Sequence, residues 1–372
     1  MAKYRFDQIA INSTEKKKPT GEDRFTYLGL EHLDSGSLKV TRYGSEVAPI
    51  GEKLVMRKGD VLFGKRRAYQ KKVAIAPFDG IFSAHGMVLR PKEDVIDRDF
   101  FPLFISSDYF LDAAIKISVG SLSPTINWRD LKELEFELPD LPTQKRLAAV
   151  LWAMNETMDS YKGLISATDE LVKSQFMEQF MMRDSYSRVP INSLVDRKIQ
   201  KRHDLVERYE NIRYIDISSI DSELKKVTGY VEYDIDAAPS RAQQVLKKGD
   251  ILVSTVRPNL QNIAVNPYSD GNVVASTGFC VLRCATCLPE YIWGVITSDA
   301  FTKAMCEQAS GISYPAVRNN DILQYLVPDV PLETQKRFAA FVRQSDKSKF
   351  ELEQALSELT ATYKSIIAEN LG

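Results

Sequence analysis

The sequence predicts an α+β fold with a pseudo-two-fold internal repeat. We expect two similar globular domains, each a mixed sheet with helices, connected by two long antiparallel coiled-coil helices. Motifs of the first half recur in the same order in the second half, and each half ends in apolar residues spaced as in a coiled coil. The 372 residues also exceed what a single hydrophobic core usually supports.

The repeat is clearest near the end of each half. Residues Gly120–Leu131 recur as Gly311–Ile322, and Thr143–Ala149 recur as Thr334–Ala340, both 191 residues later. Two shorter matches lie upstream: Lys58–Leu62 with Lys248–Leu252, and Val88–Arg90 with Val281–Arg283. We therefore expect four segments: a first domain over 1–142, a first helix over 143–183, a second domain over 184–331 and a second helix over 332–372.

The first part of each half is predicted to contain short strands. Val61–Phe63, Val73–Ile75 and Gly86–Leu89 are short apolar runs separated by Gly, Pro, Asn or Asp. Such a pattern is typical of a mixed α+β domain.

A long helix is predicted to follow each domain. Thr143 comes directly after Pro142 and is a suitable N-cap; a helix from there to about Met182 would be roughly 60 Å long. The seam of the first helix is Leu147, Leu151, Met154, Met158, Tyr161, Ile165, Thr168 and Val172. The seam of the second helix is Phe338, Val342, Ser345, Lys349, Leu352, Leu356, Leu359, Tyr363 and Ile366, with two polar positions near its start.

Each apolar seam needs a partner, because exposed apolar surface is unfavourable in water. The expected partner is the other helix of the same chain, paired antiparallel. Packing of each seam on its own domain, or a seam between two chains, are the alternatives.

The composition is that of an ordinary soluble globular protein, with 44% hydrophobic and 27% charged residues. No apolar run is long enough to cross a bilayer, Met1–Thr14 lacks a signal-like stretch, and four cysteines are too few for a disulfide framework. We therefore expect a cytoplasmic protein without a membrane partner. The formal net charge of −1 argues against indiscriminate coating of nucleic acid but allows local basic patches.

No complete catalytic or metal-binding motif is recognised. Gly59–Lys65 matches G-x-x-x-x-G-K, but residue 66 is Arg where magnesium coordination needs Ser or Thr. Cys280, Cys284 and Cys287 have no histidine or fourth cysteine nearby in sequence, so small-residue packing is preferred over a zinc site. The histidines, His32, His85 and His203, are far apart in sequence and are expected to be surface or packing residues.

Two polar segments of each half carry the side-chain types that bind DNA, since Lys and Arg contact phosphate and Arg, Lys, Asn, Gln and Ser read base edges. The candidate residues of the first segments are Lys65, Arg66, Arg67, Tyr69, Gln70, Lys71 and Lys72, and then Arg257, Asn259, Gln261 and Asn262. The loops before the long helices add Ser123, Arg129, Ser313, Tyr314 and Arg318. The five cations of 65–72 have few acids nearby in sequence, so DNA phosphate is expected to offset their repulsion. A solvated loop is the alternative for the first segments. Ordinary turns, or support of the helix base, are the alternatives for the loops before the long helices.

Jointly, these features resemble the specificity subunits of type I restriction-modification systems. The resemblance covers the whole chain and is carried by Pro139, Pro142, Gln144, Lys145 and Arg146, by Pro328, Pro331, Gln335, Lys336 and Arg337, and by the Gly59-Asp60 and Gly249-Asp250 turns. It implies two target recognition domains, each reading one half of an asymmetric bipartite site in double-stranded DNA. It also implies helices that set the spacer and dock two methyltransferase subunits.

The resemblance further implies a non-catalytic subunit of a restriction system. S-adenosylmethionine, ATP and Mg²⁺ would then belong to the methyltransferase and the helicase-nuclease restriction subunits, and this chain would hold no cofactor. A nucleotide-binding enzyme using Gly59–Lys65 and a structural coiled-coil adaptor are the alternative functions.

Overall fold

The computed structural model describes residues 1–182, 186–196, 198–311 and 313–371. The chain forms two compact units: unit 1 comprises Met1–Lys162 and Glu353–Gly372, and unit 2 comprises Gly163–Leu352. The expected boundary between residues 183 and 184 lies outside the described residues, as does Ile312 of the repeated loop. The limits expected for the four segments stay a prediction. None of the described helices is both long enough and apolar enough to span a membrane.

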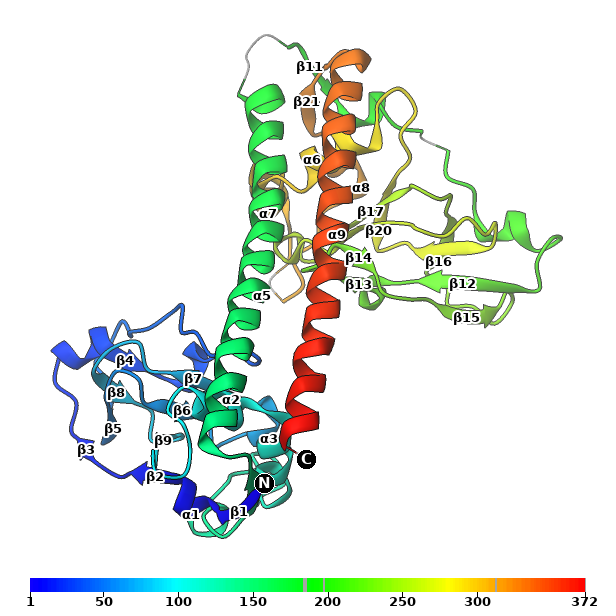
Figure 1. Cartoon of the computed structure of the whole chain (residues 1–372). Coiled ribbons are helices and arrows are strands. Elements are labelled where there is room, and N and C mark those ends of the chain that lie inside the picture. Colours follow the sequence, from blue (N-terminus) through cyan, green and yellow to red (C-terminus); the bar gives the residue numbers. More distant parts are fainter. Residues whose placement is uncertain (183–185, 197, 312, 372) are drawn as a thin grey trace. The chain divides into compact units, whose positions relative to one another are not determined.

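The strands of unit 1 are short (Figure 1). They are β1 (Ala2–Arg5), β2 (Ala10–Ser13), β3 (Lys16–Lys17), β4 (Tyr27–Leu28), β5 (Lys53–Met56), β6 (Val61–Phe63), β7 (Val73–Ile75), β8 (Gly80–Phe82), β9 (Met87–Pro91) and β10 (Glu135–Leu138). They form one sheet in the order β2-β9-β6-β7, a second in the order β3-β5-β8-β4, and the antiparallel pair β1-β10. The three runs expected to be strands are β6, β7 and β9, so that prediction is confirmed.

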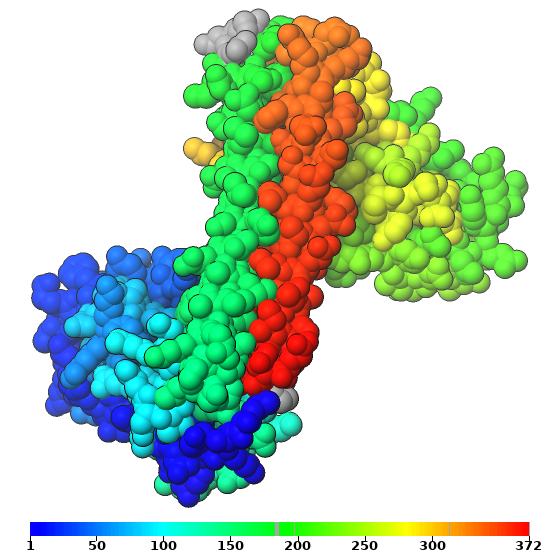
Figure 2. All heavy atoms as spheres, in the orientation of Figure 1, coloured from blue at the N-terminus to red at the C-terminus, as the bar shows by residue number. Residues whose placement is uncertain are grey.

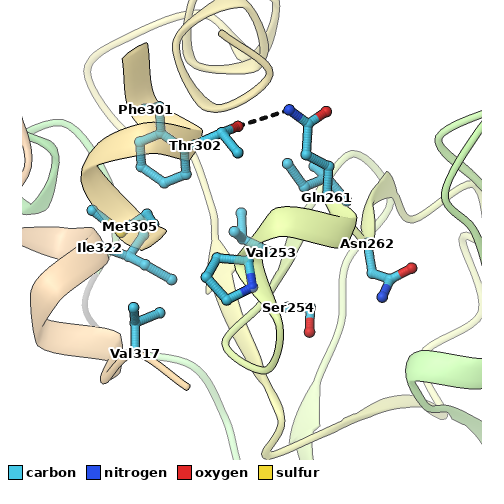
Figure 3. A pocket seen from close by; sticks show the side chains of 11 residues that line it. Val253, Ser254, Gln261, Asn262, Phe301, Thr302, Met305, Val317 and Ile322 are labelled. Atoms are coloured by element: carbon cyan, nitrogen blue, oxygen red, sulfur yellow. Dashed lines mark hydrogen bonds between the residues drawn. The ribbon is translucent and has the colours of Figure 1, made fainter. Parts of the chain in front are cut away.

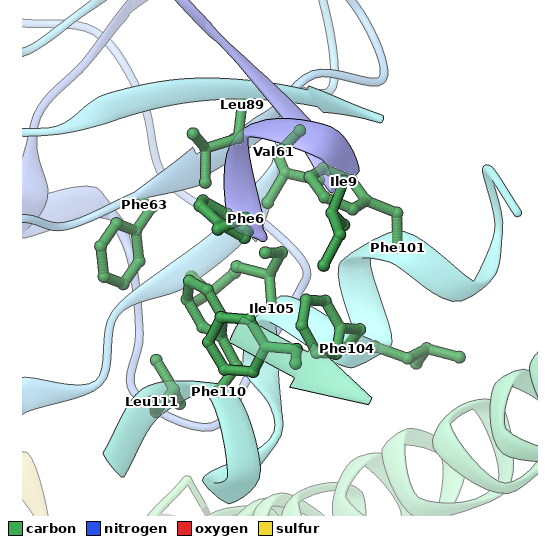
Figure 4. Close-up of a cluster of buried hydrophobic side chains, with 14 of the residues drawn as sticks. Phe6, Ile9, Val61, Phe63, Leu89, Phe101, Phe104, Ile105, Phe110 and Leu111 are labelled. Atoms are coloured by element: carbon green, nitrogen blue, oxygen red, sulfur yellow. The ribbon is translucent and has the colours of Figure 1, made fainter. Parts of the chain in front are cut away.

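Short helices and an aromatic core complete the globular part of unit 1. The helices are α1 (Phe6–Ile9), α2 (Phe100–Ser106), α3 (Asp108–Lys116) and α4 (Trp128–Leu131), with 3-10 turns η1 (Glu22–Thr26), η2 (Leu30–His32) and η3 (Ala68–Gln70). The rings of Phe6 and Phe104 lie beside Phe110, with centroids 5.0 and 5.4 Å from it (Figure 4). The ring of Phe136 also lies 5.4 Å from Phe110. Because these rings are fully buried, they hold α1, α2, α3 and β10 together.

Unit 2 has a similar globular part. Its strands are β11 (Arg188–Pro190), β12 (Asn211–Ile215), β13 (Ile220–Asp221), β14 (Lys226–Val227), β15 (Val231–Asp234), β16 (Ala242–Val245), β17 (Ile251–Ser254), β18 (Ile263–Val265), β19 (Val273–Ser276), β20 (Phe279–Leu282) and β21 (Leu326–Pro328). Its helices are α6 (Pro289–Ile296), α7 (Asp299–Gln308) and α8 (Asn319–Leu323), with 3-10 turns η5 (Ile191–Ser193), η6 (Arg202–Leu205), η7 (Ile217–Ser219) and η8 (Pro258–Leu260). The sheet orders are β13-β14-β18-β17-β20 and β15-β12-β19-β16, beside the pair β11-β21.

The central strands of the two units pair in the same register. In unit 1, Leu62 of β6 lies opposite Ala74 of β7 and Val88 of β9. In unit 2, Leu252 of β17 lies opposite Ala264 of β18 and Val281 of β20. The internal repeat is therefore a structural repeat and not only a sequence pattern.

The first long helix, α5 (Leu141–Phe176), begins two residues before Thr143. Asp140 is its N-cap, because the Asp140 Oδ1 accepts a hydrogen bond from the Thr143 backbone N–H at 2.8 Å. Thr143 as the N-cap is therefore wrong. Pro142 fits inside the first turn, where its missing N–H would have no helical partner in any case. A π-helical turn, Met177–Met181, follows α5 and forms the last part of the expected helix.

The second long helix, α9 (Leu332–Leu371), pairs antiparallel with α5. In unit 1, where green α5 and red α9 lie side by side (Figure 2), Asn155 Nδ2 donates to Tyr363 Oη at 3.4 Å and Thr360 Oγ1 donates to Met158 Sδ at 3.5 Å. In unit 2, Lys349 Nζ bonds both carboxylate oxygens of Asp169 at 2.8 and 2.9 Å. Every predicted seam position is buried or half-buried. The predicted seam is confirmed, and Lys349 is accommodated in it by an ion pair.

Candidate nucleic-acid interface

A buried ion pair fixes the base of each candidate recognition segment. In unit 1, the Asp60 carboxylate accepts from Arg90 Nε and Nη2 at 2.7 and 2.8 Å. In unit 2, Asp250 accepts from Arg283 Nε and Nη2 at 2.9 and 2.6 Å. Each Asp follows a glycine with a positive φ, Gly59 at 91° or Gly249 at 89°, which only glycine adopts readily. In each unit, the Asp of the repeated Gly-Asp motif thus pairs with the Arg of the repeated Leu-Arg motif.

The segment after β6 forms a tight turn in unit 1. The turn η3 is flanked by Arg67 and Lys71, both in the left-handed region with φ of 55° and 49°. Lys71 Nζ holds one side of the turn, since it donates to Asp108 and Asp112 of α3 at 2.7 Å each. The cations of 65–72 have few acids nearby in sequence, but the fold brings Asp108 and Asp112 to Lys71 from 36 or more residues further along the chain, so phosphate is not needed to offset the charge of Lys71.

The loop before α4 holds the other side of this turn. The Ile126 backbone N–H donates to the Lys65 carbonyl at 2.9 Å, and the Ala68 N–H donates to the Pro124 carbonyl at 3.3 Å. Arg66 and Thr125 also form a β-bridge. The two polar segments that are far apart in the first half of the sequence are therefore adjacent in the fold.

Unit 2 repeats this arrangement. The turn η8 is flanked by Arg257 and Gln261, with φ of 50° and 47°. Arg257 N–H donates to the Pro315 carbonyl at 2.7 Å, which is the counterpart of the contact to Pro124. Gln261 Nε2 donates to Thr302 Oγ1 of α7 at 2.7 Å (Figure 3). A neutral hydrogen bond therefore takes the place of the ionic contact of Lys71.

The two candidate loops of unit 2 also meet through their side chains. The Arg257 guanidinium lies over the Tyr314 ring at 4.6 Å from its centroid, and its Nη2 donates to the Ser313 carbonyl at 3.3 Å. Tyr314 is 68% exposed, so the stacked pair lies at the surface. An Arg held on an aromatic ring keeps donors free for a base or a phosphate.

The candidate residues differ in how accessible they are. Arg66, Arg67, Asn259 and Ser313 are exposed, and Tyr69 is 57% exposed. Gln70 and Asn262 are half-buried, and Lys72 is too, with its Nζ donating to the Leu30 carbonyl at 2.6 Å. Lys71, Lys72 and Gln261 are therefore held by protein groups in this structure, whereas Arg66 and Arg67 are open to solvent.

The remaining candidates lie beside the turns or on the short helices. Ser123 is half-buried, and its carbonyl accepts from Thr125 Oγ1 at 3.1 Å. Arg129 lies on α4, its side chain is 86% exposed, and it pairs with Asp130. Arg318 precedes α8, where its backbone N–H donates to Asp321 at 2.8 Å. DNA contact by any of these residues stays a prediction.

Sequence reasoning missed part of a basic surface in unit 1. Burial and the positive charge of Lys16 lower the pKa of Lys65. Burial, and then the charges of Arg66, Lys65 and Lys53, lower the pKa of His85, whose Nε2 is 3.4 Å from Arg66 Nη1. These groups therefore lie close together. No local pattern of the sequence predicts His85 or Lys16 here, because the loop before β9 meets Arg66 only in the fold, where the Arg66 N–H donates to the His85 carbonyl at 3.2 Å.

A family model, the type I restriction modification DNA specificity domain, matches this chain twice. The matched residues are 12–167 and 194–360, which together cover most of the chain. The chain belongs to this family. A curated relative is the specificity subunit of the type I restriction enzyme EcoDI of Escherichia coli, 30% identical over 182 residues. That match covers 47% of this chain and only 40% of the relative's length.

Solved structures share the fold of this specificity-domain protein over its whole length. One, from a study of complex assembly and conformational transition of the type I restriction-modification system, has a TM-score of 0.58 at 19% identity and covers 99% of this chain and 97% of that one. Another, the S subunit from M. genitalium, has a TM-score of 0.57 at 17% identity and covers 100% and 96%. At these identities the likeness concerns the fold alone.

The motif at the start of each long helix has a structural role in this specificity-domain protein. Gln144 is buried, its Oε1 accepts from the Asp97 N–H at 2.7 Å, and its Nε2 donates to the carbonyls of Pro139 and Val95 at 2.8 and 3.1 Å. Gln335 likewise accepts from the Leu288 N–H and donates to the Val330 carbonyl, both at 2.8 Å. The glutamine fastens each helix to the domain that precedes it.

The other motifs considered as chemical sites have structural surroundings. Gly59–Lys65 contains the fully buried strand β6, so its backbone amides pair within a sheet and do not form an open phosphate cradle. Cys280 is buried in β20, and Cys287 Sγ donates to the Leu194 carbonyl at 3.4 Å. In the part of the chain that the structure describes, no three His, Cys, Asp or Glu side chains are grouped as metal ligands.

Proposed function

We propose that this chain is the sequence-specific DNA-recognition subunit of a type I restriction-modification complex. Unit 1 reads one half of an asymmetric bipartite site, and unit 2 reads the other half. The observation that carries this proposal is the repeated geometry of the two candidate interfaces: the same clamped turn lies beside the same second loop in both units, with different side chains. Two similar frames with different surface chemistry are what two unlike half-sites require.

The charges of unit 1 support contact with the DNA backbone. Arg66 and Arg67 are exposed, and Lys16, Lys53 and Lys65 lie near enough to influence titratable groups of the same surface. Such a concentration of positive charge binds phosphate and releases counterions. The net charge of −1 for the whole chain keeps this attraction local.

The chemistry of the complex is assigned to partner subunits. Methyltransferase subunits, two per chain, would carry S-adenosylmethionine, and a helicase-nuclease restriction subunit would use ATP and Mg²⁺. This chain itself would hold no cofactor, catalyse no step and act in the cytoplasm. This assignment is supported by the family match and by the relative, which is a subunit of a type I restriction enzyme.

The long helices are assigned to spacing and docking. The 36 residues of α5 correspond to about 54 Å at about 1.5 Å per residue, and residues of both units belong to this helix. Val150, Leu164 and Leu171 are about half exposed and recur at multiples of seven residues along α5, outside the seam. An apolar stripe of that kind is suited to an added partner helix from a methyltransferase subunit.

Exchange of one recognition domain tests the proposed function directly. Residues 1–142 are replaced by the corresponding domain of another member of the family, and the chain is expressed with its methyltransferase partners. Methylome sequencing should show one half-site changed and the other retained. A change in both half-sites, or no sequence-specific methylation by the unaltered complex, contradicts the proposal.

Insertion of four residues near Tyr161 tests the spacing role. The insertion lengthens a helix by about 6 Å, close to two base pairs at about 3.4 Å each, although the added rotation affects the outcome. The methylated site should keep both ends and change its spacer. An active, folded variant with the original spacer would exclude the helix as the element that sets the spacer.

Substitution on the apolar stripe tests the docking role. In the same assay, Leu164→Glu should weaken assembly with the methyltransferase, and Lys162→Glu is the matched exposed control.

A further inference from the structure

The backbone of the two turns is unusual in the same way. Of the five non-glycine residues with positive φ in the described ranges, four flank η3 and η8: Arg67, Lys71, Arg257 and Gln261. Side chains larger than glycine adopt this region at a cost in free energy, so such residues persist where the surrounding structure imposes them. Both units impose them at the same two positions of the same turn.

The side chains of the two turns differ although the backbones agree. Unit 1 carries Ala68-Tyr69-Gln70, and unit 2 carries Pro258-Asn259-Leu260. The contacts that hold the turns are similar. The backbone N–H of Ala68 in unit 1 and of the flanking Arg257 in unit 2 donates to the loop before α4 or α8, and the side chain of the second flanking residue bonds α3 or α7. A fixed frame that presents variable side chains is the arrangement expected of a reading element.

Tyr69, Asn259 and Leu260 of these turns have the chemistry and exposure needed for base edges, whereas Ala68 is buried. Tyr69 is 57% exposed, Asn259 is exposed, and Leu260 is 46% exposed. A turn of three residues is narrow enough for a major groove about 12 Å wide, where an Asn amide pairs with adenine and an apolar side chain contacts the thymine methyl group. By contrast, Lys71 Nζ is bonded to Asp108 and Asp112, and Gln261 Nε2 is bonded to Thr302.

We propose that Ala68–Gln70 and Pro258–Leu260 are the base-reading elements of the two units, and that Lys71 and Gln261 are positioning residues that hold these turns. In unit 2, Asn259 and Leu260 face an A·T base pair of the half-site. This inference rests on the proposed function, because it assigns roles within the same DNA interface.

Selection of bound duplexes tests the reading role. The complete complex of this chain with its methyltransferase subunits selects from a duplex library randomised in both half-sites at one salt concentration. The Asn259→Ala variant should lose preference at one A·T position of one half-site by about 5-fold to about 150-fold. Gln308→Ala, at an exposed amide of the same unit, is the matched control and should leave all preferences unchanged.

A triple substitution, Pro258→Ala with Asn259→Tyr and Leu260→Gln, installs the unit 1 turn in unit 2. It should change the half-site read by unit 2 and leave the other half-site intact. If neither this variant nor Asn259→Ala alters base preference while the unaltered complex is selective, the reading role is overturned and the proposed function stands. If the unaltered complex selects no sequence, the proposed function fails.

Affinity measurements test the positioning role. Gln261→Ala and Thr302→Val should each weaken binding of the preferred duplex without changing which base is preferred, and the double variant should be no weaker than the more affected single variant. Lys71→Ala should behave in the same way in unit 1, and Lys71→Arg should restore affinity by bonding Asp108 and Asp112. A changed base preference in Gln261→Ala or Lys71→Ala would place these side chains on DNA and overturn the positioning role.

Discussion

The two recognition domains share a backbone frame but differ in charge. In unit 1 the turn η3 directly follows Lys65, Arg66 and Arg67, and an ionic contact from Lys71 holds it to α3. In unit 2 the exposed Arg257 stacks on Tyr314, and a neutral hydrogen bond holds the turn to α7. The backbone of the turn is thus the same in the two units although the charges around it differ. Under the proposed function, unit 1 would gain more affinity from phosphate, and unit 2 would rely more on amides and aromatic contacts.

The buried ion pairs that support the frame also differ between the domains. Asp250 and Arg283 have 2% and 12% of their side chains exposed, whereas Asp60 and Arg90 have 8% and 28%. Removing one partner of a buried pair leaves an uncompensated charge, and the cost grows as the remaining charge becomes less accessible to water. The same motif should therefore stabilise unit 2 more than unit 1.

The largest expected effect is that of Asp250→Asn. This substitution should destabilise unit 2 by about 3–5 kcal/mol, because Arg283 stays largely buried without a carboxylate. Asp60→Asn should cost less, since Arg90 can be hydrated. Hydrogen exchange of peptides from β17 and β6 at increasing urea concentration reports the two units separately. Equal losses in the two variants would show that burial does not distinguish the pairs.

The next largest effect is expected for the glutamines that anchor the long helices. Gln144→Ala and Gln335→Ala should each cost about 1–3 kcal/mol, because each leaves buried backbone groups without a hydrogen-bond partner. Gln144 bonds three backbone groups and Gln335 bonds two, so the loss in unit 1 should be the larger. The exposed neighbours Lys145→Ala and Lys336→Ala are matched controls and should change stability by less than about 0.5 kcal/mol. Thermal unfolding of the four variants separates these outcomes.

The sequence predicted the repeat, the fold class and the coiled-coil seam because these features are periodic. Buried or half-buried seam positions recur in steps of three and four, and Gly-Asp marks the same ion pair twice. The starting residue of α5 could not be predicted as well, because Asp140 and Thr143 are both good caps and Pro142 is tolerated in the first turn.

The composition of the candidate site could be predicted only in part. Local charge identified Lys65–Lys72, but which of those cations are free depends on residues distant in sequence. Lys71 forms ion pairs with Asp108 and Asp112 of α3, and Lys72 donates a hydrogen bond to the Leu30 carbonyl. His85 joins the surface for the same reason. Long-range contacts of this kind have no local pattern that a single sequence reveals.

The next effect is on the salt dependence of DNA binding, which should differ between arginine variants of the two domains. Arg66→Ala with Arg67→Ala should flatten the slope of log affinity against log salt by about one unit per lost phosphate contact. Arg257→Ala should change the slope less, because Tyr314 and the Ser313 carbonyl hold its guanidinium. If an arginine of either domain instead reads guanine, its loss removes about 1–3 kcal/mol at one base pair. Binding to preferred and one-base-changed duplexes at several salt concentrations decides this. An unchanged slope for the unit 1 variant means that the basic segment is only a solvated loop.

The smallest expected effect concerns the pH dependence of the two turn anchors. The hydrogen bond from Lys71 holds the pKa of the Asp108 carboxyl below its ordinary value of 3.8. A carboxyl whose pKa is lower in the folded state stabilises that state above the unfolded pKa, and this stabilisation is lost as pH falls through the folded pKa. The anchor of η3 should therefore weaken below about pH 4, while the Gln261–Thr302 anchor of η8 has no group that titrates there. The contribution is at most about 1 kcal/mol because the pair is partly exposed.

Hydrogen exchange of peptides 65–72 and 255–262 between pH 5 and pH 3, corrected for intrinsic rates, measures this difference in acid sensitivity between the two turns. Lys71→Gln, which copies the residue of unit 2, should abolish the additional acid sensitivity of η3. If that variant keeps the sensitivity, another titrating group controls the turn.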